Sequence, residues 1–305
     1  MYGPWVRVPA GSLTPFSGGF LLSKLCSAIY SFYFCNNMNT NFFKNKVIVI
    51  TGGSEGIGKA LVDALISMGA KVAACGRNQD KLYDLQLSHS GMHLHTMVAD
   101  VSNYNDCKNF INSTIQVFGG IDILINNAGI SMRALLKDLD VEVIKKVMDV
   151  NFNGTLYCTK LALDSIINRK GTIVGVSSIA GFRGLPGRSG YSASKFAMNG
   201  FMEALRAEMI DSDVNVMWVC PGFTTSNIRN AALDKKGQAQ GESPMDERKM
   251  MSAEKCATLI LNAIEKRKRT LVLTFTGKRT VLLNRFFPSL ADKLVKKFFF
   301  KNGKL

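Results

Sequence analysis

The chain has 305 residues, of which 47% are hydrophobic and 20% are charged, and its formal net charge at pH 7 is +15. This is the composition of a globular protein with a sizeable core, and it excludes a largely disordered chain. The seven cysteines form no Cys-X-X-Cys pair, which favours reduced thiols in a cytosolic protein over a disulfide framework. No acidic or cysteine ligand stands at ligand spacing beside the three histidines, so no metal site is predicted.

Residues 1–37 differ from the rest of the chain in having no acidic side chain and no regular hydrophobic pattern. They contain a 16-residue apolar run, residues 20–35, that Lys24 interrupts and that is short for a membrane span. Met38 then opens a segment typical of the start of an α/β domain. Residues 1–37 are therefore interpreted as an extension, with two explanations open: a start assigned upstream of Met38, and a weak membrane anchor.

From Lys46 onward, short apolar runs alternate with helical patterns such as those of residues 58–69 and 107–119. Nearly continuous apolar strands separated by helices indicate a parallel sheet covered on both faces. With right-handed crossovers, the prediction is a Rossmann-like, doubly wound α/β fold that binds ligands at the carboxyl ends of its strands. The seven expected strands are residues 47–51, 71–76, 93–100, 122–129, 171–178, 214–222 and 270–275.

A glycine-rich turn, TGGSEGIG from Thr51 to Gly58, follows the first expected strand and opens the first expected helix. Gly52, Gly56 and Gly58 permit a tight turn, and they let backbone N–H groups approach a pyrophosphate at the start of the helix. The spacing is GXXXGXG and not GXGXXG. In its strand–turn–helix context, the turn predicts nucleotide binding.

The end of the second strand bears on the choice of cofactor, because an acid there would bind the ribose hydroxyls of NAD and repel a 2′-phosphate. This chain has Cys75, Gly76, Arg77 and Asn78 at that point. Arg77 can form a charge-assisted bidentate contact with a phosphate, so NADP(H) is favoured over NAD. The pair Asp100 and Val101, at the end of the third strand, is expected beside the adenine.

Four further motifs follow in order: NNAG at 126–129, Asn151 in DVNFNG, Ser178 in VSSIAG, and Tyr191 with Lys195 in YSASK. With the TGXXXGXG turn and a later Pro-Gly pair, they make the chain resemble the short-chain dehydrogenase/reductase family from Lys46 to about Phe275. The resemblance implies one NADP-binding catalytic domain, residues 38–280, and a catalytic tetrad of Asn151, Ser178, Tyr191 and Lys195. The cofactor-binding residues that it implies are Gly52, Ser54, Glu55, Gly56, Ile57, Gly58, Arg77, Asp100, Val101, Asn127, Tyr191, Lys195, Pro221, Gly222 and Ser226.

Physical chemistry assigns roles to this tetrad, because hydride transfer to a ketone leaves negative charge on the oxygen and a proton must arrive there. Tyr191 is the expected donor, and its pKa must fall from about 10 toward about 7, which is worth about 4 kcal/mol. Lys195, one helical turn away, is expected to supply the required positive charge and to hold the nicotinamide ribose. Ser178 would bind the substrate carbonyl, and the family suggests that Asn151 binds a proton-relaying water.

Two regions near the end of the chain add expectations about the substrate. Residues 226–250 form a long polar interruption, which we interpret as a substrate lid or a disordered surface excursion. Residues 266–305 contain twelve Lys and Arg against one acid, Asp292. Within residues 281–305, apolar side chains at helical spacing lie beside lysines, as in a basic helix that binds an anionic membrane surface. A terminal helix that packs on its own domain is the alternative.

The predicted function is NADPH-dependent reduction of a ketone or 3-oxoacyl carbonyl, with a modest preference for lipid substrates. The alternative is a non-catalytic NADP-binding sensor or scaffold on the same fold. No nucleic-acid recognition module is present in the sequence. The family resemblance implies dimers or tetramers formed through the helices that carry Asn151 and Tyr191, and the expected location is cytoplasmic, with membrane association left open.

Overall fold

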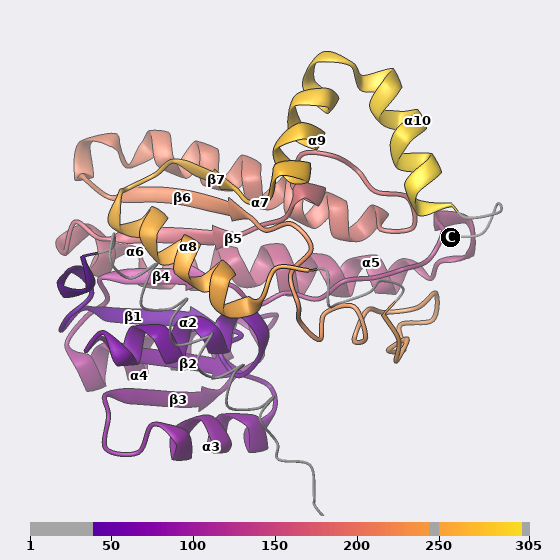
Figure 1. The fold of residues 1–305 in the computed structure, drawn as a ribbon. Helices are drawn as coiled ribbons and strands as arrows, with labels where there is room; N and C mark the ends of the chain where they lie inside the picture. Colours follow the sequence, from indigo (N-terminus) through magenta and orange to yellow (C-terminus); the bar gives the residue numbers. More distant parts are fainter. Residues whose placement is uncertain (1–38, 244–249, 301–305) are drawn as a thin grey trace, which may run out of the picture. The chain divides into compact units, whose positions relative to one another are not determined.

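A parallel sheet of seven strands in the order β3-β2-β1-β4-β5-β6-β7 organises the residues that the computed structural model describes, 39–243 and 250–300 (Figure 1). The predicted doubly wound parallel fold is confirmed. The order reverses between β1 and β4, and this switch point opens a crevice at the carboxyl ends of the strands. The strands are β1 (Val47–Thr51), β2 (Lys71–Gly76), β3 (Leu94–Val98), β4 (Ile123–Asn126), β5 (Thr172–Val176), β6 (Asn215–Cys220) and β7 (Thr270–Val272).

Helices cover both faces of the sheet. α2 and α8 pack together on one face, and α4, α6 and α7 cover the other (Figure 1). The helices are α2 (Gly56–Ser67), α3 (Gln79–Ser88), α4 (Tyr104–Phe118), α5 (Val141–Met148), α6 (Gly154–Asn168), α7 (Ser189–Glu208), α8 (Ala253–Glu265), α9 (Phe275–Phe286) and α10 (Pro288–Phe299). Four short 3-10 helices and the π-helical turn η3 (Asp149–Asn153) complete the described elements: η1 (Thr40–Phe42), η2 (Leu136–Asp138), η4 (Ile179–Gly181) and η5 (Ile210–Ser212).

The hydrophobic core explains why the strands are apolar throughout. Val49, Leu124 and Val216 point to the face where Phe110 of α4 and Met198 of α7 pack against them. Their neighbours in the sequence are equally buried against the other face. Because both faces of each central strand are covered, hydrophobic residues are required at successive positions and not at alternate ones.

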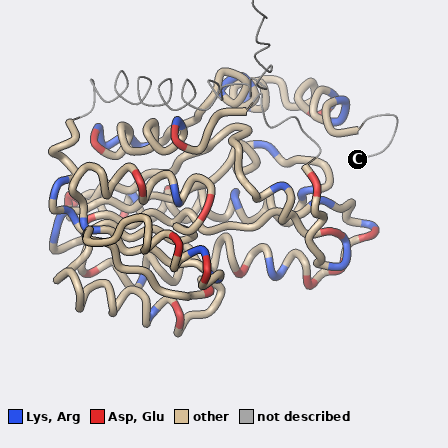
Figure 2. The backbone as a smooth tube through the Cα atoms, turned by 60° about the horizontal axis from the view of Figure 1, so that its bottom comes forward, with Lys and Arg blue, Asp and Glu red and all other residues tan. Residues whose placement is uncertain are grey.

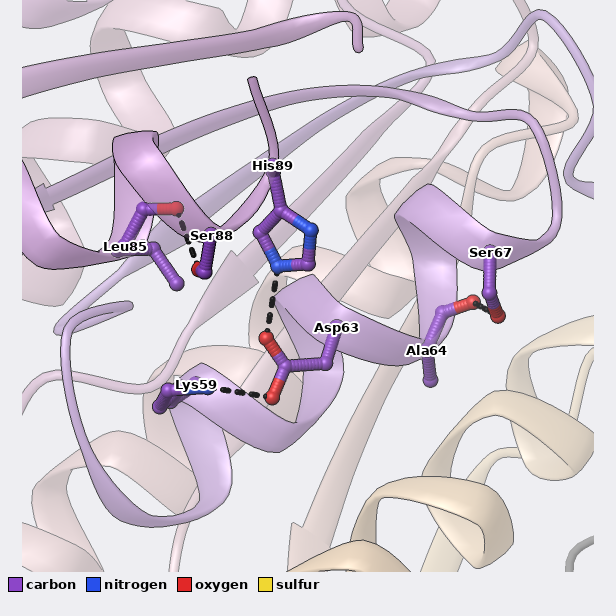
Figure 3. A network of polar contacts seen from close by, with 7 residues as sticks. All are labelled: Lys59, Asp63, Ala64, Ser67, Leu85, Ser88 and His89. Carbon is purple, nitrogen blue, oxygen red and sulfur yellow. Dashed lines mark hydrogen bonds and ion pairs between the residues drawn. The ribbon is translucent and has the colours of Figure 1, made fainter. Parts of the chain in front are cut away.

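A polar network joins the end of α3 to α2 (Figure 3). His89, just after α3, places Nε2 2.9 Å from Asp63 Oδ1, and Lys59 Nζ donates to Asp63 Oδ2 at 2.7 Å. His95 lies elsewhere, with Nε2 3.0 Å from the hydroxyl of Ser113. These histidines thus serve packing between helices and strands. The described residues contain no cluster of three side chains suited to a metal ion.

Beyond β7 the chain forms the helical pair α9 and α10, which stands over the carboxyl edge of the sheet (Figure 1). Basic residues outnumber acids on these two helices, where Asp292 is the one acid (Figure 2). The predicted domain boundary at residue 280 falls inside α9. No described helix combines the length and the hydropathy needed to cross a membrane. The expected extension, residues 1–37, lies outside the described residues.

Candidate active site

A cavity of about 950 Å³ lies at the carboxyl ends of β1 to β6. All the predicted cofactor-binding residues except Gly58 contribute to its wall, and so do three members of the predicted tetrad. Gly58 and Asn151 are not among the residues that line the cavity. The predicted residues that line the cavity are Gly52, Ser54, Glu55, Gly56, Ile57, Arg77, Asp100, Val101, Asn127, Ser178, Tyr191, Lys195, Pro221, Gly222 and Ser226.

The glycine turn brings the start of α2 unusually close to the end of β1. Gly52 has a φ of +65°, a conformation that favours glycine. A Cβ on Gly58 would lie 2.0 Å from the carbonyl oxygen of Gly52, so only glycine fits there. Glu55 occupies the N-cap of α2 without forming a side-chain cap. The first backbone N–H groups of α2 are therefore not capped by Glu55, and the turn that carries them faces the cavity.

Asn127 ties this turn to β4. Its side-chain Nδ2 donates to the carbonyl oxygens of Thr51 and Gly52, both at 3.0 Å. In return, the hydroxyl of Thr51 accepts hydrogen bonds from the backbone N–H groups of Asn127 and Ala128. These bonds hold together the two strands between which the sheet order reverses. Asn127 thereby fixes the shape of the crevice.

Arg77 lies at the far end of the cavity, beyond β2. Its guanidinium is 4.0 Å from the carboxylate of Asp100, and its side chain is 57% exposed. The Asp100 carboxylate also accepts hydrogen bonds from the backbone and hydroxyl of Ser102. Glu55, the acid of the glycine turn, pairs with Lys81 Nζ at 2.5 Å. The two acids of the cavity wall therefore each lie beside a cation.

Asn151 has a fully buried side chain inside the π-helical turn η3. Its Oδ1 accepts from the backbone N–H of Ile130 at 2.8 Å, and its Nδ2 donates to the carbonyl of the same residue at 3.0 Å. Nδ2 also donates to the hydroxyl of Ser194 at 2.9 Å. The side chain thus holds the loop after β4 against α7. The contact of Ser194 with Asn151 could not be predicted from the sequence, because a serine among small helix residues resembles a packing position.

Tyr191, Ser178 and Lys195 meet on the wall of the cavity. Ser178 follows β5, and its hydroxyl lies close enough to the phenol of Tyr191 to lower the pKa of that phenol. Lys195 lies one turn along α7 and is 3% exposed. Its Nζ donates to the carbonyl of Val176 at 2.9 Å and lies 5.8 Å from the centre of the Tyr191 ring.

In the cofactor-free protein, the pKa of Tyr191 does not show the expected fall. Burial raises the pKa of Tyr191, while the hydrogen bond from Ser178 and the nearby cations Arg188 and Arg229 act in the opposite direction. Burial also lowers the pKa of Lys195, to about 8. Lys195 was expected to be the cation that lowers the pKa of Tyr191, and that role stays a prediction. In the cofactor-free protein, Arg188 and Arg229 are the cations that act to lower this pKa.

Two features of the cavity were not anticipated. Arg188 lines it three residues before Tyr191, but an isolated arginine in a glycine-rich loop carries no sequence pattern. The outer wall is apolar and comes from α9 and α10. The apolar face of α10, for which a membrane surface and packing on its own domain were both left open, contributes to this wall. Its lining residues on the two helices include Leu282, Leu283, Phe286, Phe287, Ala291, Leu294, Val295, Phe298 and Phe299.

The described part of the polar segment after β6, residues 226–243, packs beside the active-site helix. Leu233 exchanges backbone hydrogen bonds with Ser131 and Arg133, and its side chain is buried in a cluster with Met132 and Tyr191. The first residues of the segment, from Ser226, line the cavity. The described part is therefore anchored against the site, as a substrate lid would require.

Comparison with known proteins agrees with this arrangement. Residues 46–237 match the model of a family described as short chain dehydrogenase. The chain is 36% identical over 264 residues to a rat protein named dehydrogenase/reductase SDR family member 7B, covering 83% of this chain and 81% of the relative. The Xenopus tropicalis protein of the same name is 32% identical, over 94% of this chain and 93% of the relative.

A plant relative and a solved structure extend the comparison. The Arabidopsis thaliana protein named 11-beta-hydroxysteroid dehydrogenase-like 2 is 31% identical, over 92% of this chain and 88% of its own length. The crystal structure of a short chain dehydrogenase/reductase from Burkholderia phymatum in complex with NAD superposes with a TM-score of 0.72 at 24% identity. That match covers 81% of this chain and 95% of the bacterial one, and it shows the fold.

Proposed function

The chain belongs to the short-chain dehydrogenase/reductase family of oxidoreductases, and on that premise we propose that it reduces a ketone or 3-oxoacyl carbonyl to an alcohol, using NADPH. One observation carries the proposal. Tyr191, Ser178 and Lys195 lie on the wall of the same cavity as the glycine turn at the start of α2. A proton donor and a phosphate-binding turn thus share one enclosed space, which is what reduction by a dinucleotide requires.

The cavity fits a nicotinamide dinucleotide in two ways. Glu55 leaves the N-terminal N–H groups of α2 without a side-chain cap beside the cavity, where a pyrophosphate would accept hydrogen bonds from them. Because Gly52 and Gly58 have no Cβ, the turn packs closely on Ala128 and on itself, and its backbone forms the cavity wall at Gly52 where a pyrophosphate would lie. When bound, NADPH supplies the hydride that the carbonyl carbon accepts.

The residues of the chain supply the proton and the orientation. Ser178 donates a hydrogen bond to the carbonyl oxygen, and Tyr191 transfers its phenolic proton to the same oxygen as negative charge develops there. The phenol of Tyr191 is protonated before reaction. Burial raises its pKa, so the proposal requires the nearby cations, Arg188 and Arg229 among them, to offset that rise during proton transfer. Lys195 is placed to bind the nicotinamide ribose. Asn151 positions the loop after β4 and, as part of the proposal, the proton-relaying water.

We further propose that Arg77 selects NADPH over NADH by binding the 2′-phosphate. We expect Arg77→Ala to weaken NADPH binding by about tenfold to a hundredfold, because a charge-assisted bidentate contact is lost. NADH binding should change little. The NADPH affinity of Arg77→Lys, which keeps the charge, should lie between that of the wild type and that of Arg77→Ala. Dissociation constants from the fluorescence of the two reduced cofactors measure this. An unchanged ratio of the two constants in Arg77→Ala would exclude Arg77 as the selecting residue.

Size and polarity of the cavity favour a bulky apolar substrate. The outer wall is built from the apolar residues of α9 and α10, and residues from Ser226 onward close another side. Long-chain ketolipids such as 3-ketosphinganine, 3-oxoacyl thioesters and steroid-like ketones are the substrate classes that suit such a wall. Contact of α10 with an anionic membrane stays a prediction. The same holds for a dimer or tetramer formed through α6 and α7.

A non-catalytic NADP-binding sensor is the alternative, since it would need the same cofactor cavity. A sensor that only binds NADP does not need a proton donor or an oxyanion-binding group. Ser178, Tyr191 and Lys195 lie together on one wall of the cavity, and this grouping favours the enzyme. NADPH oxidation in the presence of a panel of ketones and 3-oxoacyl compounds separates the two functions. Turnover of any carbonyl supports the reductase. Tight NADPH binding without turnover of any of them supports the sensor.

A further inference from the structure

Arg188 stands out among the cations that line the cavity. It is the N-cap residue of α7, one helical turn before Tyr191. Its backbone is fixed at both ends, since its N–H donates to the carbonyl of Leu185 and its carbonyl accepts from Ser192. The guanidinium carbon lies 6.0 Å from the ring centre of Phe299 in α10. Among the described residues, no carboxylate forms an ion pair with this guanidinium.

The other cations nearby are already engaged. Lys195 Nζ donates to the carbonyl of Val176, and the Arg229 guanidinium donates to the carbonyl of Thr224 at 3.0 Å. Arg133 is paired with Glu242 at 3.4 Å and bonds to Gln240. Arg279 of α9 also lines the cavity, with its guanidinium carbon 5.6 Å from the ring centre of Phe275. Of the cations near Tyr191, Arg188 is the one left with a guanidinium that the described residues do not engage in an ion pair or hydrogen bond.

The surroundings of Arg188 carry an excess of positive charge. Of the described residues that line the cavity, the two acids are Glu55 and Asp100, and both lie at the end where Arg77 is found. Among the described lining residues, the end near Tyr191 has the cations Arg188, Lys195 and Arg229 and no acid. Burial, followed by the like charges of Arg133 and Arg229, lowers the pKa of Arg188. Cations held together in a partly buried site attract an anion that neutralises them.

We propose that Arg188 binds an anionic group, a carboxylate or a phosphate, that the substrate carries close to its ketone. The substrate is then an acidic amphiphile: its charged group lies on Arg188, its carbonyl on Tyr191 and Ser178, and its apolar chain along α9 and α10. This inference rests on the proposed reductase function, and it adds the charge that the substrate must have. Arginine suits the role because its planar donors match both groups.

Matched substrates test the proposal in the full-length protein with NADPH. Three ketones of equal chain length are compared: a keto acid, its methyl ester, and an analogue with a phosphate monoester in place of the carboxylate. We expect the wild type to prefer the anionic ketones over the ester by about tenfold to a hundredfold in kcat/KM. The relative rates of the acid and the phosphate show which anion is bound.

Three variants connect the preference to Arg188. Arg188→Gln should abolish the preference by raising KM for the anionic ketones far more than for the ester, and Arg188→Lys should retain part of the preference. Because Arg188 also acts on the pKa of Tyr191, the ratio of kcat/KM for acid and ester is the quantity compared, and not the absolute rate. Arg285→Gln removes an exposed arginine of α9 that does not line the cavity, and it should keep the full preference. Equal rates for acid and ester in the wild type, or a preference that survives in Arg188→Gln, would overturn the proposal.

A binding measurement separates this proposal from the reductase function itself. Calorimetry on the NADPH-loaded protein compares decanoate with decanol, which differ in charge and share the apolar chain. Tighter binding of decanoate in the wild type, lost in Arg188→Gln, supports the anion site even if no ketone is reduced. Equal binding of the two compounds contradicts it, whatever the catalytic result.

Discussion

Tyr191→Phe is expected to lower kcat for carbonyl reduction by about a hundredfold to ten-thousandfold, because the variant has no phenolic proton to give to the developing oxyanion. The ring itself is buried against Met132 and Leu233, and phenylalanine keeps this packing. Cofactor affinity should therefore change little. Steady-state rates with NADPH and a reducible ketone, together with the dissociation constant for NADPH, give both quantities.

Tyr157→Phe provides the matched control. Tyr157 packs edge-to-face on Tyr104 with ring centres 5.4 Å apart, and it does not line the cavity. Loss of its hydroxyl should leave kcat unchanged. Full activity in Tyr191→Phe would refute the assignment of Tyr191 as the proton donor, and an equal loss in both variants would point to a general structural effect.

Lys195→Met is expected to have opposite effects on activity and on stability. Activity should fall by about a hundredfold or more, since the variant loses the cation beside the reacting groups. The cofactor-free protein should become more stable at pH 7 by about 2 kcal/mol, because a buried ammonium is replaced by an apolar side chain of similar length. The lost hydrogen bond to Val176 reduces the gain. Urea unfolding of the two proteins measures the difference.

The pH dependence of the stability difference between Lys195→Met and the wild type identifies the cause of that difference. Burial lowers the pKa of Lys195 from the model-compound value of 10.5 to about 8 in the folded protein. Between these two values the unfolded chain binds the proton and the folded chain does not, so wild-type stability rises with pH. The part of the Lys195→Met advantage that comes from the buried charge should be largest below pH 8 and gone only above about pH 10.5. A difference that stays constant with pH would contradict the burial of charge.

The sheet could be predicted from the sequence because its strands are buried on both faces. Runs such as residues 47–51 and 214–222 are apolar at successive positions, and the helices between them leave few alternatives to a parallel sheet. The predicted ends were less accurate at β4, where NNAG was included in the strand. The structure ends β4 at Asn126, since Asn127 turns away to bind the glycine turn.

The site residues at the ends of the strands could also be predicted from the sequence. The fold places the carboxyl ends of parallel strands at one edge, so motifs far apart in the chain come together there. Interactions among those residues were harder to foresee. The water expected at Asn151 and the electrostatic role expected of Lys195 stay predictions. What could not be foreseen is that Asn151 bonds to Ile130 and Ser194, and that Lys195 bonds to Val176.

The outer part of the cavity could not be predicted, for a physical reason. An amphipathic helix has an apolar face, but its sequence does not say what that face meets. Phe287, Leu294 and Phe298 suited a membrane surface or a domain surface equally well. The structure shows that they belong to the cavity wall. The anion-binding role proposed for Arg188 also depends on the fold, which places Arg188 one helical turn before Tyr191 and gives it no carboxylate partner among the described residues.

The central claim is that a hydride passes from NADPH to a carbonyl carbon in this cavity, and isotope transfer tests it most directly. NADPH carrying deuterium at the reactive carbon of the nicotinamide ring is incubated with the protein and a reducible ketone, and the product is analysed by mass spectrometry. The account predicts one deuterium on the carbinol carbon of the alcohol. An alcohol without deuterium, or bound NADPH that never transfers it to any carbonyl tested, would contradict the claim.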